Sequence, residues 1–280
     1  MNEGADALSV DPYLFAKWIL FEDENLLVLN KPGWLVCHPS KNGPWSSLVG
    51  AAKEYIGVDS LHLVSRLDRE TSGVVMIAKH KKSASFWQKG VEARMVGRIY
   101  LAIVRGEIRQ ETKVKTFLGN ATDSKVFVKQ AIAKESRKSK VALTRFLPVK
   151  FADEHTLCLV QTETGRKHQI RVHAQHIGHS IVGDKLYGED EAFYLSFCEG
   201  GWNNKWYDTL GMNRQALHGL LMNHKNEDQE FIAPLPKDMM EFLNKRLGWD
   251  KYEIKDLVVK FLNKLGCTVS LEQLSNTSNE

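Results

Sequence analysis

The sequence predicts an α+β fold, in which strands and helices follow one another in no strict alternation. Apolar runs rich in β-branched residues and bounded by turn residues indicate strands at 18–21, 26–30, 61–64, 74–78, 99–104, 142–148 and 156–162. Apolar residues at helical spacing indicate helices at 45–56, 82–95 and 166–177. Because some strands follow each other directly and others are separated by helices, a regular α/β alternation is disfavoured.

The first predicted element is a hairpin. Its strands, 18–21 and 26–30, are joined by the polar residues Glu-Asp-Glu-Asn, which are typical of a short turn. Pro32 and Gly33 supply the next turn. The helical segment 45–56 then crosses over to the strand at 61–64.

Further helices are predicted in the rest of the chain, two of them near its C-terminus. The helix at 82–95 precedes the strand at 99–104, and Gly165 interrupts the chain ahead of the last core helix. Segments 239–247 and 252–265 have the apolar spacing of two amphipathic helices. The polar residues 270–280 predict a mobile tail.

Composition is that of an ordinary soluble protein. At 280 residues the chain can form one large domain or two small ones with a normal core. Its four cysteines are far apart, with no Cys-x-x-Cys pair and no zinc-finger spacing, so we expect reduced thiols. There is no signal-peptide pattern and no stretch as long as a membrane span, so we expect a cytoplasmic protein that does not bind membranes.

Positive charge is concentrated in one stretch. The net charge of +4 is modest, but residues 121–150 contain eight basic residues against two acidic ones. Such a stretch neutralises phosphates and gives salt-dependent affinity for a polyanion. The alternative is a solvated basic face.

A polar octapeptide, residues 66–73 with the sequence Arg-Leu-Asp-Arg-Glu-Thr-Ser-Gly, lies between the predicted strands at 61–64 and 74–78. It places a charged cluster at the end of a sheet. The arginines on either side of Asp68 should lower its pKa and keep it ionised, which suits a nucleophile or a base better than an acid. The alternative is an ion-paired surface turn.

The octapeptide resembles the signature of the RluA-type pseudouridine synthases, and six further segments resemble parts of that family in the same order. These are residues 30–38, 98–106, 164–173 (Thr-Gly-Arg-Lys-His-Gln-Ile-Arg-Val-His), 178–188, 214–219 and 232–236. The resemblance covers residues 20–240 in outline. It implies the pseudouridine synthase catalytic fold, with a large mixed, mainly antiparallel bent sheet flanked by helices and loops.

The resemblance also implies a reaction. An RNA pseudouridine synthase breaks the bond between ribose and uracil nitrogen 1, rotates the base and rejoins it through carbon 5. This isomerisation requires no metal and no other cofactor, and the sequence has neither a Gly-rich phosphate loop nor clustered metal ligands. The implied substrate is a uridine of structured rRNA or tRNA, flipped out of a helix or taken from an unpaired loop.

Three residues receive catalytic roles from the resemblance. Asp68 reacts, either by covalent attack or by removing the ribose 2′ proton to give a glycal. Tyr100 stacks on the target base and helps to remove the proton from carbon 5, although a tyrosine with Ala102 and Val104 on its face of a strand is by default a core residue. Arg171 orients Asp68 and keeps it ionised.

Two further residues are candidates for substrate binding. By resemblance Arg66 inserts into the vacated base stack; the alternative is a phosphate contact or a surface ion pair. His168 shares a polar stripe of the predicted helix with Arg171 and Gln175, at i, i+3 and i+7. His168 and His173 lie on different helical faces, which argues against a metal pair, so we expect structural or RNA-facing histidines.

The domain organisation follows from the extent of the resemblance. We expect an N-terminal extension (1–17), a catalytic domain (18–240) with an insertion (189–213), and a C-terminal helical extension with a mobile tail (241–280). The insertion contains three closely spaced aromatic residues, Trp202, Trp206 and Tyr207. They stack on unpaired bases or, as we favour, pack the insertion onto the domain. We expect a monomer.

Two other function classes compete with the isomerase. One is a non-catalytic RNA-binding or ribosome-assembly protein with the same fold, which the joint presence of Asp68, Tyr100 and Arg171 disfavours. The other is a hydrolase that uses Asp68 together with Glu70. Only the first of these two acids has a catalytic counterpart in the family.

Overall fold

The computed structural model describes residues 9–38 and 43–275, which fall into two compact units. The N-terminal unit comprises residues 9–98, 218–236 and 262–275, and the central unit comprises residues 99–217 and 237–261. The expected catalytic domain contributes to both units. Its boundaries stay a prediction.

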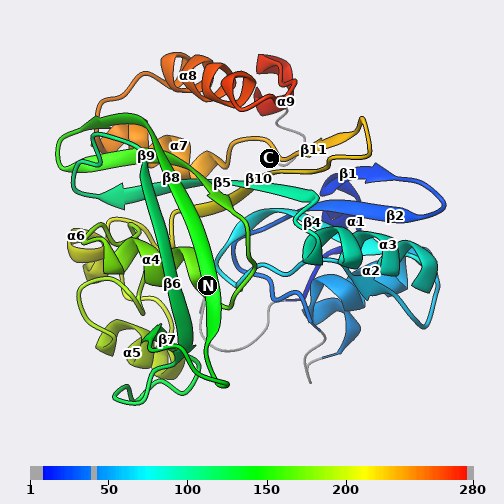
Figure 1. Cartoon of the computed structure of the whole chain (residues 1–280), viewed down its shortest axis with the longest axis horizontal. Helices are drawn as coiled ribbons and strands as arrows, with labels where there is room; N and C mark the ends of the chain where they lie inside the picture. The colour runs from blue at the N-terminus through cyan, green and yellow to red at the C-terminus, as the bar shows by residue number, and fades with distance from the viewer. Residues whose placement is uncertain (1–8, 39–42, 276–280) are drawn as a thin grey trace. The chain divides into compact units, whose positions relative to one another are not determined.

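A sheet with the strand order β1-β2-β4-β10 forms the N-terminal unit, with β3 paired to β4 and β11 paired to β10 (Figure 1). The strands are β1 (Ile19–Glu22), β2 (Leu26–Lys31), β3 (His62–Leu63), β4 (Ser72–Ala78), β10 (Leu217–His224) and β11 (Glu230–Ile232). β4 and β10 are parallel, whereas the other pairs are antiparallel. The antiparallel pairing of β1 with β2 confirms the predicted hairpin.

Both faces of this sheet are covered, which explains why every residue of β4 is buried. Val75 and Ile77 join a core cluster that also contains Phe15 of α1 (Pro12–Lys17) and residues of α2 (Leu48–Ile56). Val74, Met76 and Ala78 join a second cluster with Trp87 of α3 (Lys81–Glu92). A strand buried on both sides is a continuous apolar run rather than an alternating one, as residues 74–78 are.

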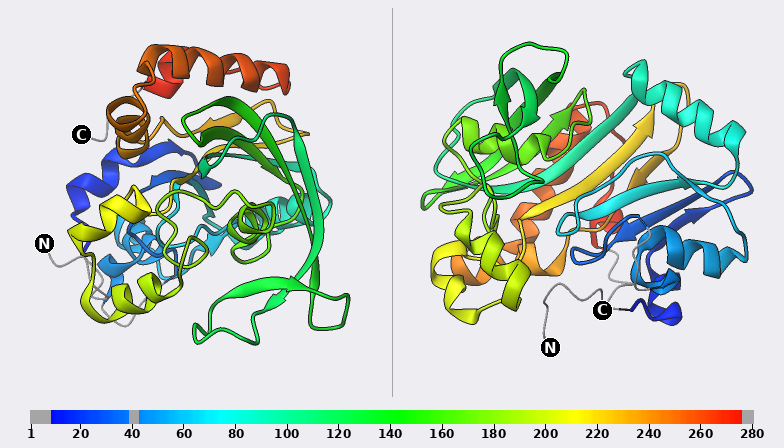
Figure 2. Two further views of the ribbon diagram at one scale, coloured as in Figure 1. Left: turned by 90° about the vertical axis from the view of Figure 1, so that its left-hand side faces the viewer. Right: turned by 90° about the horizontal axis from the view of Figure 1, so that it is seen from below.

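The central unit is built on an antiparallel sheet with the order β5-β9-β8-β6-β7. The strands are β5 (Val96–Arg105), β6 (Thr112–Asn120), β7 (Gln130–Ala133), β8 (Lys140–Ala152) and β9 (His155–Thr162). The first three residues of β5 belong to the N-terminal unit. The green ribbons of β6, β7 and β8 lie side by side in Figure 1, and Figure 2 shows the chain from two further directions.

Helices and short helical turns complete both units. They are η1 (Pro44–Ser46), α4 (Gln169–His176), α5 (Ala192–Gly200), η2 (Asn204–Trp206), α6 (Tyr207–Leu210), α7 (Lys237–Glu241), the π-helical segment η3 (Phe242–Arg246), α8 (Lys251–Lys264) and α9 (Leu271–Ser275). Together with the mixed, largely antiparallel pairing, they confirm the predicted α+β class.

The structure adds elements to those predicted from the sequence. α1, β6 and β7 were not predicted, and the expected insertion, 189–213, for which no structure had been predicted, contains helices. Residues 271–275, placed in the expected tail, form α9, whose Leu274 is buried and whose carbonyl accepts from the Leu235 N–H. This hydrogen bond attaches the short helix to the chain at Leu235. Residues 276–280 lie outside the described part.

All four cysteines are free, as the sequence predicted. Within residues 9–38 and 43–275, no helix is both long and apolar enough to span a bilayer.

Candidate active site

Asp68 lies in the loop between β3 and β4, where the sequence placed it. The Thr71 N–H donates to the Asp68 carbonyl at 3.1 Å and closes a turn. The Asp68 side chain is half-buried, whereas Arg66 is exposed. Because the loop has no regular secondary structure, its conformation depends on contacts from neighbouring segments.

A buried ammonium group, that of Lys31 at the end of β2, holds this loop. Lys31 Nζ donates to the carbonyl oxygens of Pro32 and Leu35, both at 2.7 Å, and of Arg69 at 3.0 Å. A buried charge requires such hydrogen bonds. Lys31 thereby connects the segment after β2 to the loop that carries Asp68.

Two further side chains connect the same segments. Arg69 Nε donates to the Trp34 carbonyl at 3.1 Å, and Cys37 Sγ donates to the Leu67 carbonyl at 3.4 Å. Arg69 thus supports the loop through its side chain.

The Cys37 thiol is a structural donor. Burial raises its pKa, and the charge of Asp68 raises it further, whereas Lys31 and Arg66 act in the opposite direction. A thiol with a raised pKa is protonated at neutral pH and is a poor nucleophile.

Gly73 fixes where β4 begins beside β10. Its φ of 110° is in the region that favours glycine, and a Cβ atom would lie 2.2 Å from the Gly219 carbonyl oxygen. One residue earlier, Ser72 Oγ and His218 Nδ1 form a 2.8 Å hydrogen bond. The last two residues of the octapeptide therefore attach the loop to the sheet.

Arg66 projects from the same loop and contacts His38, with 3.1 Å between Nη1 and the His38 Nε2. Desolvation lowers the pKa of His38, and the positive charge of Arg66 lowers it further. A neutral ring accepts the hydrogen bond from the guanidinium. Arg66 is thus displayed at the surface of the N-terminal unit.

Tyr100, Arg171 and His168 belong to the central unit. Tyr100 lies in β5, half-buried, opposite Val160 of β9. Its neighbours Ala102 and Val104 on the same face are fully buried. Tyr100 is therefore more exposed than the core residues that follow it.

Arg171 forms a two-point ion pair with Asp184, with Nε to Oδ2 at 2.6 Å and Nη2 to Oδ1 at 2.8 Å. Asp184 also accepts from the N–H groups of Leu186 and Tyr187. Burial acts to raise the pKa of Asp184, but Arg171 and these donors outweigh it and hold the pKa below its usual range. The sequence interpretation had assigned Arg171 to Asp68 alone and had missed Asp184.

His168 is not part of the helical stripe predicted for it. α4 begins at Gln169, and His168 precedes it with a left-handed φ of 55°. His168 Nδ1 lies 2.8 Å from the Tyr187 hydroxyl, and the Arg171 guanidinium lies 4.9 Å from the centre of the same ring. Tyr187 therefore supports both residues.

The rest of the 164–173 motif is structural. Gln169 Nε2 donates to the Leu143 carbonyl and to Thr144 Oγ1, at 2.8 and 2.9 Å, which fastens the start of α4 to β8. His173 is fully buried between the hydroxyls of Thr116 and Thr144, each at 2.8 Å. Burial lowers its pKa to about 4. His173 is therefore structural, one of the two roles expected.

The aromatic residues of the 189–213 segment pack against each other. Trp202 contacts Trp206 and Tyr207 edge-on, at 5.4 and 4.9 Å between ring centres. The Lys185 ammonium lies 5.3 Å from the Trp202 ring. The rings thus pack against each other and against Lys185, while Tyr207 keeps 42% of its surface exposed.

The basic stretch divides into two groups. Three of its cations form ion pairs within the central unit: Lys129 with Glu191, Arg145 with Glu111, and Lys150 with Glu253. The other five are exposed and form no ion pair among the described residues: Lys125, Lys134, Arg137, Lys138 and Lys140. They lie in the loops on either side of β7 and, for Lys140, at the start of β8.

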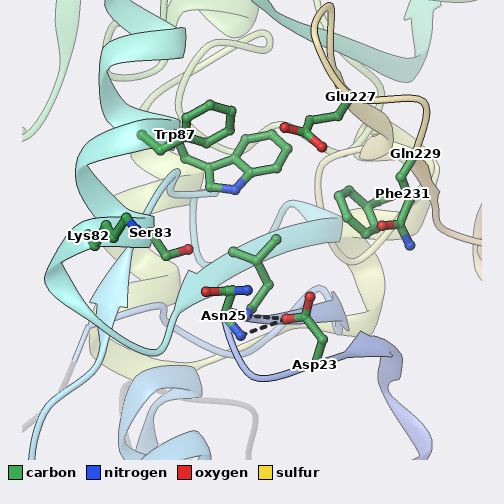
Figure 3. A pocket seen from close by; sticks show the side chains of 10 residues that line it. Asp23, Asn25, Lys82, Ser83, Trp87, Glu227, Gln229 and Phe231 are labelled. Atoms are coloured by element: carbon green, nitrogen blue, oxygen red, sulfur yellow. Dashed lines mark hydrogen bonds between the residues drawn. The ribbon is translucent and has the colours of Figure 1, made fainter.

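A pocket of about 320 Å³ lies elsewhere in the N-terminal unit, lined by residues that include Asn25, Trp87 and Phe231 (Figure 3). Leu26, in its wall, pairs with Ala78 at the end of β4, whereas Asp68 precedes the start of β4. This pocket is therefore separate from the Asp68 loop.

Comparison with protein families identifies a match to the model described as RNA pseudouridylate synthase, over residues 25–176. An uncharacterised RNA pseudouridine synthase of Mycoplasma pneumoniae is 38% identical over 182 residues, which are 65% of this chain and 58% of that protein. The chain thus spans less than two thirds of that relative.

Other relatives are covered more fully. The ribosomal large subunit pseudouridine synthase D of Yersinia pestis is 32% identical over 247 residues, or 85% of this chain and 73% of that protein. The solved structure of human RNA pseudouridylate synthase domain containing 4 has a TM-score of 0.63 at 23% identity. It covers 84% of this chain and 94% of the human chain, and this similarity concerns the fold.

Proposed function

Because the chain belongs to the RNA pseudouridylate synthase family, a family of isomerases that act on RNA, we propose that it converts specific uridines of structured RNA to pseudouridine with Asp68 as the reacting carboxylate. The observation that carries this proposal is the Asp68 loop. It accepts hydrogen bonds from Lys31 and Cys37, is tied by Arg69 to the segment after β2, and leaves Asp68 half-buried.

The chemistry requires a carboxylate that is placed before the substrate arrives. Asp68 attacks covalently or removes the ribose 2′ proton, and the uracil leaves through nitrogen 1, turns and rejoins through carbon 5. Hydrogen bonds to the loop carbonyls supply the preorganisation that makes a catalytic group effective.

The other roles come from the family resemblance. Tyr100 stacks on the uracil and assists loss of the proton from carbon 5. Arg171 steadies the ionised Asp68, and the Asp184 pair restricts the orientation of its guanidinium. Arg66, exposed on the Asp68 loop, fills the space that the flipped nucleotide vacates, and His168 contacts the substrate.

Ribosomal RNA is the substrate class we propose first. The Yersinia pestis relative is named as an enzyme of the large ribosomal subunit, and the match covers most of this chain. The five exposed cations near β7 provide a surface for phosphates. We further propose that the protein acts as a monomer in the cytoplasm, where its free cysteines stay reduced.

The proposal is tested with purified protein and ribosomal RNA labelled with tritium at carbon 5 of uridine. Wild-type protein should release tritium as carbon 5 becomes the point of attachment. Asp68→Asn should release none while keeping its circular dichroism spectrum and most of its RNA affinity. Asp59→Asn, at an exposed position of the same unit, is the matched control.

The two competing classes make different predictions in this assay. A non-catalytic RNA-binding protein releases no tritium in its wild-type form. A hydrolase releases free uracil, and it loses activity with Glu70→Gln as well as with Asp68→Asn. Full activity of Asp68→Asn would refute the assignment of the carboxylate.

A further inference from the structure

Phe127 is the most exposed large hydrophobic side chain in the described part of the chain, at 93% of its full accessibility. It lies in the loop between β6 and β7. Its neighbour Val126 is buried, in a core cluster with Leu118 and Tyr187. The loop therefore inserts one apolar side chain into the unit and presents the next one to solvent.

The conformation of this loop is fixed by backbone hydrogen bonds and by Tyr187. The Lys129 N–H donates to the Val126 carbonyl at 2.9 Å, and the Ala121 N–H donates to the Lys129 carbonyl at 3.0 Å. The Gln130 N–H donates to the Tyr187 hydroxyl at 2.7 Å. Exposure of Phe127 thus belongs to an ordered turn.

Glu191, in the 189–213 segment, anchors the loop from outside. Its carboxylate accepts from Ser124 Oγ and Lys129 Nζ, both at 2.7 Å, and from the Lys125 N–H at 3.4 Å. The hydrogen bonds of Lys129 and Ser124 lower the pKa of Glu191, so the anchor is ionised at neutral pH. The 189–213 segment, to which the sequence assigned no role, therefore positions the turn that carries Phe127.

Phe127 lies in a stretch of the chain that is rich in cations. Lys125 is two residues away, and β7 leads from the loop to the turn that carries Lys134, Arg137 and Lys138. The only acids of residues 121–140 are Asp123 and Glu135. An aromatic ring among cations is the arrangement by which proteins bind unpaired nucleic acid, with bases stacked on rings and phosphates on cations.

We propose that Phe127 stacks on an unpaired base of the substrate RNA, that the exposed cations near β7 bind the adjacent phosphates, and that Glu191 positions the loop. This inference rests on the proposed function, because it takes RNA as the substrate. It adds a binding residue that the sequence interpretation did not consider. A protein partner is disfavoured, because Phe127 is the one exposed apolar side chain of its loop, with Val126 buried and Val128 partly buried.

The test measures RNA affinity by fluorescence anisotropy at several salt concentrations, together with the kinetics of tritium release. Phe127→Ala should weaken binding about tenfold, which corresponds to about 1.4 kcal/mol and lies within the range for one stacked base. KM should rise and kcat should stay unchanged. Phe127→Trp should restore the affinity, since every aromatic ring offers a stacking face.

The salt dependence separates stacking from charge. Phe127→Ala should leave the slope of log K against log salt unchanged, whereas Lys138→Ala should lower it by about 0.7–0.9. Tyr252→Ala is the matched control, because Tyr252 is 65% exposed and beside Lys251 in the same unit. It should bind RNA as the wild type does.

Glu191→Gln is tested alone and together with Phe127→Ala. If Glu191 acts through Phe127, the double variant binds RNA about as weakly as Phe127→Ala alone. Additive losses would overturn the positioning role of Glu191.

If Phe127→Ala binds RNA as tightly as the wild type does, the inference about Phe127 is overturned. Tritium release by the wild type would still support the proposed function in that case. A change from dimer to monomer in sedimentation, with unchanged RNA affinity, would likewise overturn it and indicate a contact between copies. Absence of tritium release by the wild type would refute the proposed function itself.

Discussion

Lys31 shows how the position of Asp68 depends on a side chain that is distant in sequence. In the sequence it stands in an Asn-Lys-Pro-Gly turn, where a lysine is normally solvated. In the structure it is fully buried, because three carbonyl oxygens converge on its ammonium group.

Lys31→Met should therefore destabilise the protein by roughly 3 kcal/mol or more, since buried carbonyls lose charge-assisted hydrogen bonds. Activity should fall more than the folded fraction does, because the Asp68 loop loses its anchor. Urea unfolding and tritium release measure both effects. Lys89→Met, at an exposed position of α3, is the control, and identical behaviour of the two variants would contradict the anchoring role.

The burial of His173 makes stability depend on pH. Its pKa falls from 6.5 to about 4 in the folded protein, so between these values the unfolded chain binds a proton that the folded chain does not. The contribution of His173 to the free energy of unfolding is therefore fully present above pH 6.5 and is lost as the pH falls toward 4. This contribution is about 3 kcal/mol.

Urea unfolding at pH 7.5 and 4.5 measures this contribution. His173→Gln, which keeps a hydrogen-bonding side chain without a titrating ring, should lose less stability over this interval than the wild type does. Equal losses would show that other groups carry the acid sensitivity.

At the scale of single residues, Asp68 and Arg66 could be proposed as site residues from the sequence, because the motif that contains them is local. It could not identify Asp184 as the partner of Arg171, because this pair forms only when α4 packs against the turn at 181–184. Phe127 was missed because an isolated phenylalanine in a sequence predicts burial.

At the scale of elements, β4 was predicted and β6 was not. The run at 74–78 is continuously apolar, which is a strong signal. In β6 the exposed Lys113 and Lys115 alternate with the buried Val114. Such an alternation is typical of a strand that is buried on one face only, and it is a weaker signal than a continuous apolar run. β7 has only four residues, and it forms because β6 is beside it.

Gly73 tests the parallel pairing of β4 with β10. Gly73→Ala should cost more than about 3 kcal/mol, because it combines a left-handed φ with a Cβ atom 2.2 Å from the Gly219 carbonyl oxygen. Gly57→Ala has a similar φ and open space around it, so it should cost only about 1–2 kcal/mol. Equal unfolding free energies for these two variants would contradict the close approach of the strands.

At the scale of the whole molecule, the α+β class followed from elements that sequence patterns identify well. The division into two units did not, because β5 and β10 each contribute residues to both units and a continuous strand carries no boundary signal. The residues assigned to the reaction are distributed over both units, with Asp68 and Arg66 in one and Tyr100 and Arg171 in the other.

The most direct test of the central claim maps pseudouridines across total RNA in cells that lack the gene and are complemented with either the wild type or Asp68→Asn. Specific pseudouridines, in ribosomal RNA on our proposal, should disappear in the deletion strain, return with the wild type and stay absent with Asp68→Asn at equal protein levels. Restoration by Asp68→Asn, or a pseudouridine map unchanged by the deletion, would contradict the account.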